Sequence, residues 1–251
     1  MTLGITYGGI YGLGNDQASI RDRFGLLSLV AIGASNMAVA STIRIFAKEK
    51  SIVAQEIATN MYNTIPYFVA KAMAEVPPLI VYSGIFSAII YPLTGLNPAK
   101  GKFQKFIGLT SLHTITTTAA GLAVGSIAPN SDVAIALLPP ILVVSIIFDG
   151  KNISAESVPK PVRWLQEVGL VRWGFEALCA NEFEGLKFDT SGPRRGPLIK
   201  TGSEALAQFG LDESTLRNAI NAMFRVLGGG WLLSILGLTL TKQKFEIMYA
   251  P

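Results

Sequence analysis

The chain has 251 residues, half of them hydrophobic and 15% charged, with a formal net charge of +4. A soluble globular protein carries charge on about a quarter of its residues, so a chain with a mean hydropathy of +0.43 cannot present an ordinary water-soluble surface. The densest basic cluster, 44–50, also contains Glu49, which argues against nucleic acid as a partner. The single cysteine, Cys179, excludes an intrachain disulfide. This composition indicates an integral, multi-pass membrane protein.

The first apolar segment, 1–14, is rich in glycine but only about half as long as a membrane span. It lacks the basic start of a secretory signal peptide. We interpret it as the outer half of a first span that begins upstream. The next apolar segment, 24–43, has twenty residues without a charge. At about 1.5 Å per residue it can cross roughly 30 Å of hydrocarbon, so we expect a transmembrane helix there.

Charged residues return between 44 and 65, where we expect an amphipathic cytoplasmic segment that couples the protein to a partner. Further predicted spans follow at 67–94, 104–129, 132–149 and 220–241. The tail 242–251 is predicted to lie in the cytoplasm together with 44–65, since four spans separate the two. Three lysines of the loop 95–105 then fall outside, against the positive-inside tendency.

The polar stretch 150–219 is predicted to be a large extracytoplasmic loop. Within it, 162–183 alternates aromatic residues with isolated charges. This segment is too charged to span a bilayer, but it is amphipathic enough to lie at the interface or to dip in as a re-entrant pair. Trp164 and Trp173 would sit at headgroup level. Asn152 opens a glycosylation acceptor pattern close to the bilayer.

The sequence lacks the motifs that carry catalysis. It has no phosphate-binding loop of the G-x-x-x-x-G-K-[ST] kind, and the glycines 228–230 are followed by Trp231, which favours close helix packing. His113 lies in an apolar run without a cluster of other metal ligands, so we interpret it as a helix-packing residue. We therefore expect no catalytic activity, cofactor or metal site in this chain by itself.

Several short motifs, in one order along almost the whole chain, together resemble the transmembrane domain of the G subfamily of ABC transporters, the white/brown-complex half-transporters. They lie at 20–25, 48–50 with Glu56, 67–71 with 75–77, 91–96, 148–150, 172–178 and 181–183. The segment 186–189 continues as in plant-type members.

This resemblance implies an all-α membrane protein with an ABC-2 type, G-subfamily exporter bundle and a large extracytoplasmic loop that contains re-entrant helices. It also implies a dimer of two half-transporters, identical or different, whose ATP-binding domains lie N-terminal to the spans. No such nucleotide-binding domain is present in this sequence. ATP and Mg²⁺ would therefore act through a domain supplied upstream or by another chain. The implied partners are a second half-transporter, that domain, membrane lipid and a small amphipathic substrate.

In the family, substrate enters a slot between the second and fifth spans of the two subunits. The resemblance implies a substrate pathway that includes Ser35, Asn36, Met37, Pro139, Phe148 and Asn152. Interhelical hydrogen bonding is the alternative role for Ser35 and Asn36. Coupling to the ATPase would run through Glu49, Lys50 and Glu56, with a solvated charged face as the alternative.

The expected function is ATP-driven export of lipid-like or amphipathic small molecules. The alternatives are an ATP-independent channel or carrier and an inactive membrane fragment. A carrier usually places acidic or paired charged residues in mid-membrane. The predicted spans are almost free of such residues, with His113 as the exception.

Overall fold

The structure, a computed structural model, describes residues 13–59, 61–147, 164–189, 198–211 and 216–240. Within these ranges the regular secondary structure is helical, apart from one isolated antiparallel bridge between Lys187 and Thr201. The prediction of an all-α protein is confirmed. The predicted half-span at 1–14 lies almost entirely outside the described residues, as does the tail 242–251.

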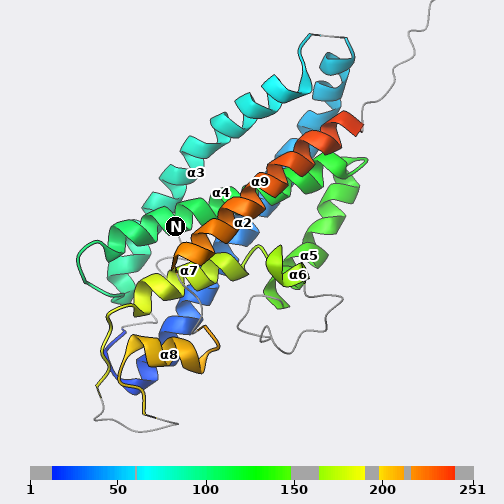
Figure 1. Cartoon of the computed structure of the whole chain (residues 1–251). Coiled ribbons are helices and arrows are strands. Elements are labelled where there is room, and N and C mark those ends of the chain that lie inside the picture. Colours follow the sequence, from blue (N-terminus) through cyan, green and yellow to red (C-terminus); the bar gives the residue numbers. More distant parts are fainter. Residues whose placement is uncertain (1–12, 60, 148–163, 190–197, 212–215, 241–251) are drawn as a thin grey trace, which may run out of the picture.

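Four described helices are long and apolar enough to cross a membrane. They are α2 (Gln17–Ala58), α3 (Thr64–Thr94), α4 (Lys102–Ile127) and α9 (Leu216–Leu240). A fifth apolar helix, α5 (Ser131–Ile147), is shorter. These helices confirm the prediction of an integral membrane protein. Figure 1 shows α2, α4 and α9 running side by side, with α3 diverging from them along much of its length.

Helix α2 extends well beyond the predicted span 24–43 in both directions. It begins at Gln17 and continues without a break through most of the charged segment that we expected to be separate, ending at Ala58. The reason lies in the sequence, since 44–58 contains neither proline nor glycine and is rich in Ala, Glu and Lys, which favour a helix. With 42 residues, α2 is about 63 Å long at 1.5 Å per residue, roughly twice the thickness of the hydrocarbon core.

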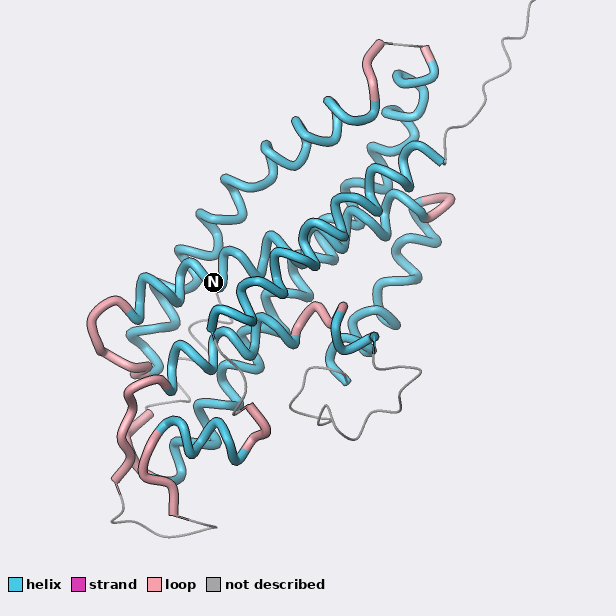
Figure 2. The backbone as a smooth tube through the Cα atoms, in the orientation of Figure 1, coloured by secondary structure: helices cyan, strands magenta, loops and turns pink. Residues whose placement is uncertain are grey.

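Helix α4 is the centre of the bundle and contacts α2, α3, α5, α7 and α9 (Figure 2). Small residues allow these close contacts. A Cβ atom on Gly230 of α9 would lie 3.1 Å from the backbone of Ala119. A Cβ atom on Gly125 would lie 2.9 Å from the ring of Phe46 on α2. Within a membrane, helix association depends on such backbone proximity because lipid provides no hydrophobic driving force.

Helix α3 is buried along only a small part of its surface. Its exposed apolar side chains include Met73, Val81, Tyr82 and Ile85. In a bilayer these side chains would be solvated by lipid, so their exposure agrees with a membrane-spanning helix.

Two short helices, α7 (Arg172–Phe183) and α8 (Gly202–Gln208), lie toward the end of the bundle where α2 begins, and a third, α6 (Trp164–Glu167), lies near α5 (Figure 1). Following the predicted orientation, we call the end where α2 begins the outer end, and the opposite end, with the α2–α3 turn, the inner end. The predicted re-entrant segment 162–183 includes α6 and α7. From Gly174 to Phe183, every residue of α7 is buried.

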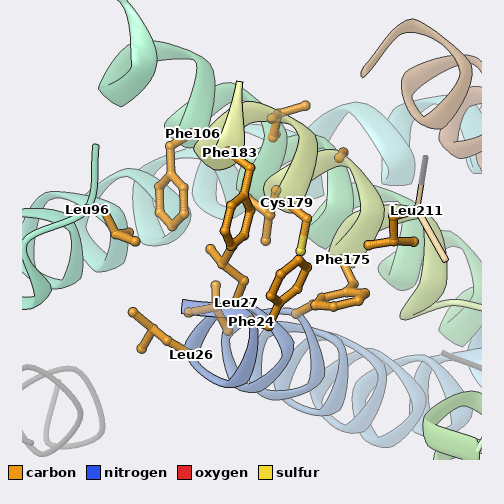
Figure 3. Packing of buried hydrophobic residues seen from close by; sticks show 14 of the residues in the cluster. Phe24, Leu26, Leu27, Leu96, Phe106, Phe175, Cys179, Phe183 and Leu211 are labelled. Carbon is orange, nitrogen blue, oxygen red and sulfur yellow. The ribbon is translucent and has the colours of Figure 1, made fainter. Parts of the chain in front are cut away.

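Aromatic side chains join the region of α7 and α8 to α2. The ring centroids of Phe24 and Phe183 lie 4.3 Å apart, and those of Phe24 and Phe209 lie 3.9 Å apart. Figure 3 shows Phe24, Phe175 and Phe183 between α2 and α7, with Leu27 and Cys179 beside them. Helix α7 thus packs inside the protein and fixes the position of the outer end of α2.

Candidate functional site

A charged cluster joins α2 to α3 at the inner end. The Lys71 Nζ atom lies 2.5 Å from Glu49 Oε2 and 3.2 Å from Glu75 Oε1. The side chain of Glu49 is 40% exposed and that of Lys71 is 15% exposed. Beside this ion pair is a groove of about 390 Å³, lined by Glu49 and Lys71 together with Ile52, Val53, Tyr67, Ala70 and Ala74. The predicted coupling residue Glu49 is therefore accessible, although it already has a partner in its own chain.

The second predicted coupling residue, Glu56, lies in the last turn of α2, two residues before Ala58. The Tyr62 hydroxyl donates a hydrogen bond to its carboxylate. Burial, together with the hydrogen bond to Glu56 and the charge of Glu56, raises the pKa of Tyr62 to about 12. The rings of Tyr62 and Tyr67 stack with centroids 5.6 Å apart. Glu56 thus helps to order the turn between α2 and α3, and its side chain stays partly exposed.

The third predicted coupling residue, Lys50, faces the interior of the bundle. Its Nζ atom donates to the backbone oxygens of Ser126 at 2.5 Å and Ala128 at 2.7 Å. These oxygens belong to the C-terminal end of α4. The three residues predicted for coupling therefore diverge: Glu49 contacts α3, Glu56 contacts the α2–α3 turn, and Lys50 contacts α4.

The predicted pathway residues on α2 point in different directions. Ser35 is fully buried, and its Oγ lies 2.9 Å from Nε2 of His113. Asn36 is half-buried, and its Oδ1 has no hydrogen-bond partner among the described residues. Met37 is 66% exposed. Ser35 thus makes an interhelical contact in this chain, whereas Asn36 and Met37 border the outward face of α2. Their role in a pathway stays a prediction.

His113 occupies a space that glycine leaves open. Its Nε2 also lies 3.0 Å from the carbonyl oxygen of Ala31. A Cβ atom on Gly174 of α7 would lie 2.1 Å from Nδ1 of His113, well inside van der Waals contact. The histidine therefore fits between α2, α4 and α7 only because residue 174 has no side chain.

Pro139 is exposed on α5 and lies within a helix that is unbroken over its described length. Its neighbours Val143 and Val144 on the same helix are also exposed. The other two predicted pathway residues, Phe148 and Asn152, lie outside the described residues.

A buried ion pair at the outer end was not predicted from the sequence. Arg23 of α2 donates to Glu182 of α7, and their side chains are 2% and 1% exposed. The backbone N–H of Asn97 donates to the same carboxylate at 3.0 and 3.2 Å. Arg23 also donates to the carbonyl oxygens of Gly14 at 3.1 Å and Gly95 at 3.4 Å.

One signal for this pair was present in the sequence. Arg23 directly precedes a long apolar run, and Glu182 directly precedes Phe183 at the end of the motif 181–183. A charge placed in such a run needs a partner. The 159 positions between the two residues prevent their pairing from being read locally.

Taken together, the apolar spanning helices and the tightly packed central helix define a polytopic α-helical membrane domain. The chain belongs to the ABC-2 type transporter family, whose family model matches residues 1–183. The predicted resemblance to G-subfamily ABC transporters is confirmed by its relatives.

ABC transporter G family member 7 from Arabidopsis thaliana is 34% identical over 243 residues, which cover 96% of this chain and 33% of the relative. The broad substrate specificity ATP-binding cassette transporter ABCG2 from Sus scrofa is 32% identical over 221 residues, covering 84% of this chain and 33% of the relative. Protein white from Drosophila melanogaster is 26% identical over 220 residues, covering 84% and 32%. The chain thus spans about a third of the length of these relatives.

Proposed function

We propose that this chain is the membrane-spanning permease part of an ATP-driven exporter of lipid-like or amphipathic small molecules. Membrane transport follows from the family, whereas the energy source, the substrate class and the assembly are our proposal. The permease would work as a dimer of half-transporters, with ATP-binding domains supplied upstream or by another chain. ATP and Mg²⁺ would bind those domains, and this chain would not act as an enzyme by itself.

The observation that carries this proposal is the inner extension of α2. The helix runs without interruption from the buried pair at Arg23 to Glu56, and its inner end carries the partly exposed carboxylates Glu49 and Glu56. A continuous helix transmits displacement along its length, so a partner that engages these carboxylates can move the membrane part of α2. An ATPase docked at the inner end would be such a partner.

The substrate class is supported by the outward faces of α2 and α5. Met37 on α2 and Val143 and Val144 on α5 expose apolar surface. Next to Met37, the amide oxygen of Asn36 is buried and has no hydrogen-bond partner among the described residues. Apolar walls with few polar groups select a bulky amphiphile by shape and by a small number of hydrogen bonds. A second half-transporter facing these helices would enclose such a pathway. The relative named for broad substrate specificity is in line with this chemistry.

The structure gives less support to an ion-coupled carrier. Such carriers bring acidic or paired charged groups together in mid-membrane. Where α2 meets α4, the buried side chains of Ser35 and His113 bond to each other. This contact satisfies the serine hydroxyl within the bundle and favours a packing role.

The test uses inside-out membrane vesicles that contain the native full-length polypeptide. Uptake of a fluorescent phospholipid, a sterol and a hydrophilic dye is measured with ATP and with a non-hydrolysable ATP analogue. We expect ATP-dependent uptake of at least one amphiphile and none of the hydrophilic dye. Equal uptake with both nucleotides would indicate a channel or carrier, and no uptake of either amphiphile would contradict the proposal.

A further inference from the structure

Lys50 caps the C-terminus of α4 from a different helix. Its Nζ atom lies 2.5 Å from the oxygen of Ser126 and 2.7 Å from the oxygen of Ala128, on either side of the last helical residue, Ile127. The last carbonyls of a helix lack intrahelical partners and form the negative end of the helix dipole. A lysine ammonium there makes charge-assisted hydrogen bonds, which are stronger than neutral ones.

The corner between α4 and α5 is short and tightly bonded. Only the residues 128–130 separate the two helices. Asn130 caps α5, because its Oδ1 accepts from the N–H of Val133 at 2.9 Å and its carbonyl oxygen accepts from the N–H of Ala134 at 3.1 Å. Lys50 holds the α4 side of this corner, and Asn130 holds the α5 side.

A second contact from α2 supports the same end of α4. Phe46, one turn before Lys50, is fully buried, and its ring fills the space above Gly125. Lys50 and Phe46 therefore both contact the last turn of α4 from one face of α2. The neighbouring Glu49 points elsewhere, to Lys71 on α3.

We propose that Lys50 is a positioning residue that makes the α4–α5 corner follow the inner end of α2. In this arrangement, movement imposed on Glu49 and Glu56 reaches the α4–α5 corner through the Lys50 ammonium group, in addition to the direct packing of α2 against α5. The proposal rests on the proposed function, because it assumes that an ATPase acts on the inner end of α2. Lys50 would thus transmit movement from α2 to the α4–α5 corner within the chain, whereas Glu49 and Glu56 would contact the ATPase.

The experiment measures amphiphile transported per ATP hydrolysed by the full-length protein in proteoliposomes. Lys50→Met keeps the apolar stem and removes the charge and the donors, whereas Lys50→Arg keeps both. We expect Lys50→Met to retain ATP hydrolysis while transport per ATP falls at least about fivefold, the lower range of measured couplings between sites. Lys50→Arg should restore most of the ratio. Lys105→Met, which removes an exposed charge at the opposite end of α4, is the matched control.

A transport-to-ATP ratio that stays unchanged in Lys50→Met would overturn the proposal, and so would an equal loss of both activities. Lys50→Met could also fail to accumulate, so a distance measurement on the protein with Lys50 in place provides an independent test. Spin labels at Gln55 and Val133, both exposed, report on α2 and on the start of α5. The proposal predicts the same distance with and without vanadate-trapped nucleotide, and a shift beyond the nucleotide-free distribution would contradict it.

These two measurements separate the inference from the proposed function. If the unaltered protein shows no ATP-dependent uptake, the proposed function fails. If uptake is present but the Gln55–Val133 distance shifts, the inference about Lys50 fails alone.

Discussion

The two ends of helix α2 carry charged residues in opposite environments. At the outer end, Arg23 and Glu182 are almost fully buried, and their partners all come from the chain itself. At the inner end, Glu49 is 40% exposed, and its ion pair with Lys71 borders an open groove. The first arrangement fixes α2 to α7 and to the α3–α4 loop. The second leaves carboxylates within reach of a partner, so one helix combines a fixed end with an end that can respond.

The largest expected effect comes from breaking the buried pair. Removing one member of a buried ion pair leaves an uncompensated charge and costs about 3–5 kcal/mol. Glu182→Ala should therefore strongly reduce the thermal stability and the yield of the purified protein. The matched control is Glu184→Ala, two residues further along, because that side chain is 66% exposed while its partner Lys102 lies at 2.7 Å. Equal losses in the two variants would contradict the comparison.

A double substitution sharpens the same prediction. If the cost of Glu182→Ala arises from the stranded Arg23 charge, then Arg23→Met combined with Glu182→Leu should recover much of the lost stability. The measurement is the melting temperature of each variant in the same detergent. A double variant less stable than Glu182→Ala would show that the pair contributes beyond neutralising its own charges.

The next largest effect is expected where α7 meets His113. Gly174→Ala places a methyl group on a ring that has no room to move, and overpacking of this kind costs about 1–3 kcal/mol. Gly228→Ala in α9 is the control, since a Cβ atom there meets nothing within 4 Å. We expect a lower melting temperature for the first variant and an unchanged or higher one for the second. The reverse order would refute the packing role of His113.

At the inner end, a small effect on stability should accompany a large effect on transport. A partly exposed ion pair contributes about 0–1 kcal/mol, so Glu49→Gln should leave the melting temperature nearly unchanged. ATP-dependent uptake should nevertheless fall, because the substitution removes the carboxylate that we propose to engage an ATPase. Full transport activity in Glu49→Gln, at normal protein levels, would argue that Glu49 serves only its contact with Lys71.

The smallest effect concerns pH. The hydrogen bond from Lys102 and its charge lower the pKa of Glu184. A carboxyl group with a lowered pKa in the folded protein contributes stability above its unfolded pKa and loses it as the pH falls through the folded pKa. The difference in melting temperature between the unaltered protein and Glu184→Gln should thus be present at pH 7 and shrink on acidification. Because the Glu184 carboxylate is 66% exposed, solvent screens its interaction with the buried Lys102, and we expect less than about 1 kcal/mol.

Much of the architecture could be predicted from the sequence because the relevant signals are local. Uncharged runs of about 20 residues identify spans, and the ordered motifs from 20–25 to 181–183 led to the family. The continuation of α2 to Ala58 was foreseeable in part, since nothing in 44–58 stops a helix. The return of charged residues at 44 suggested that the helix ends there, but α2 continues through this position to Ala58.

The directions of individual side chains could not be predicted. In a helix that is apolar on most sides, the pattern does not show which face is buried, so Ser35, Asn36 and Met37 looked equivalent. Successive residues are about 100° apart around a helix, and packing against His113 decides that Ser35 points inward. The inward direction of Lys50 depends likewise on where α4 ends, which is 77 positions away at Ile127.

The contrast between the two ends of α2 can be tested most directly by paired distances in the full-length protein. Labels at Asp22 and Lys100 measure the outer end, and labels at Gln55 and Met73 measure the inner end; all four positions are exposed, whereas Cys179 is fully buried. We predict that vanadate-trapped nucleotide changes the inner distance and leaves the outer distance unchanged. An outer distance that shifts while the inner one stays constant would contradict the account.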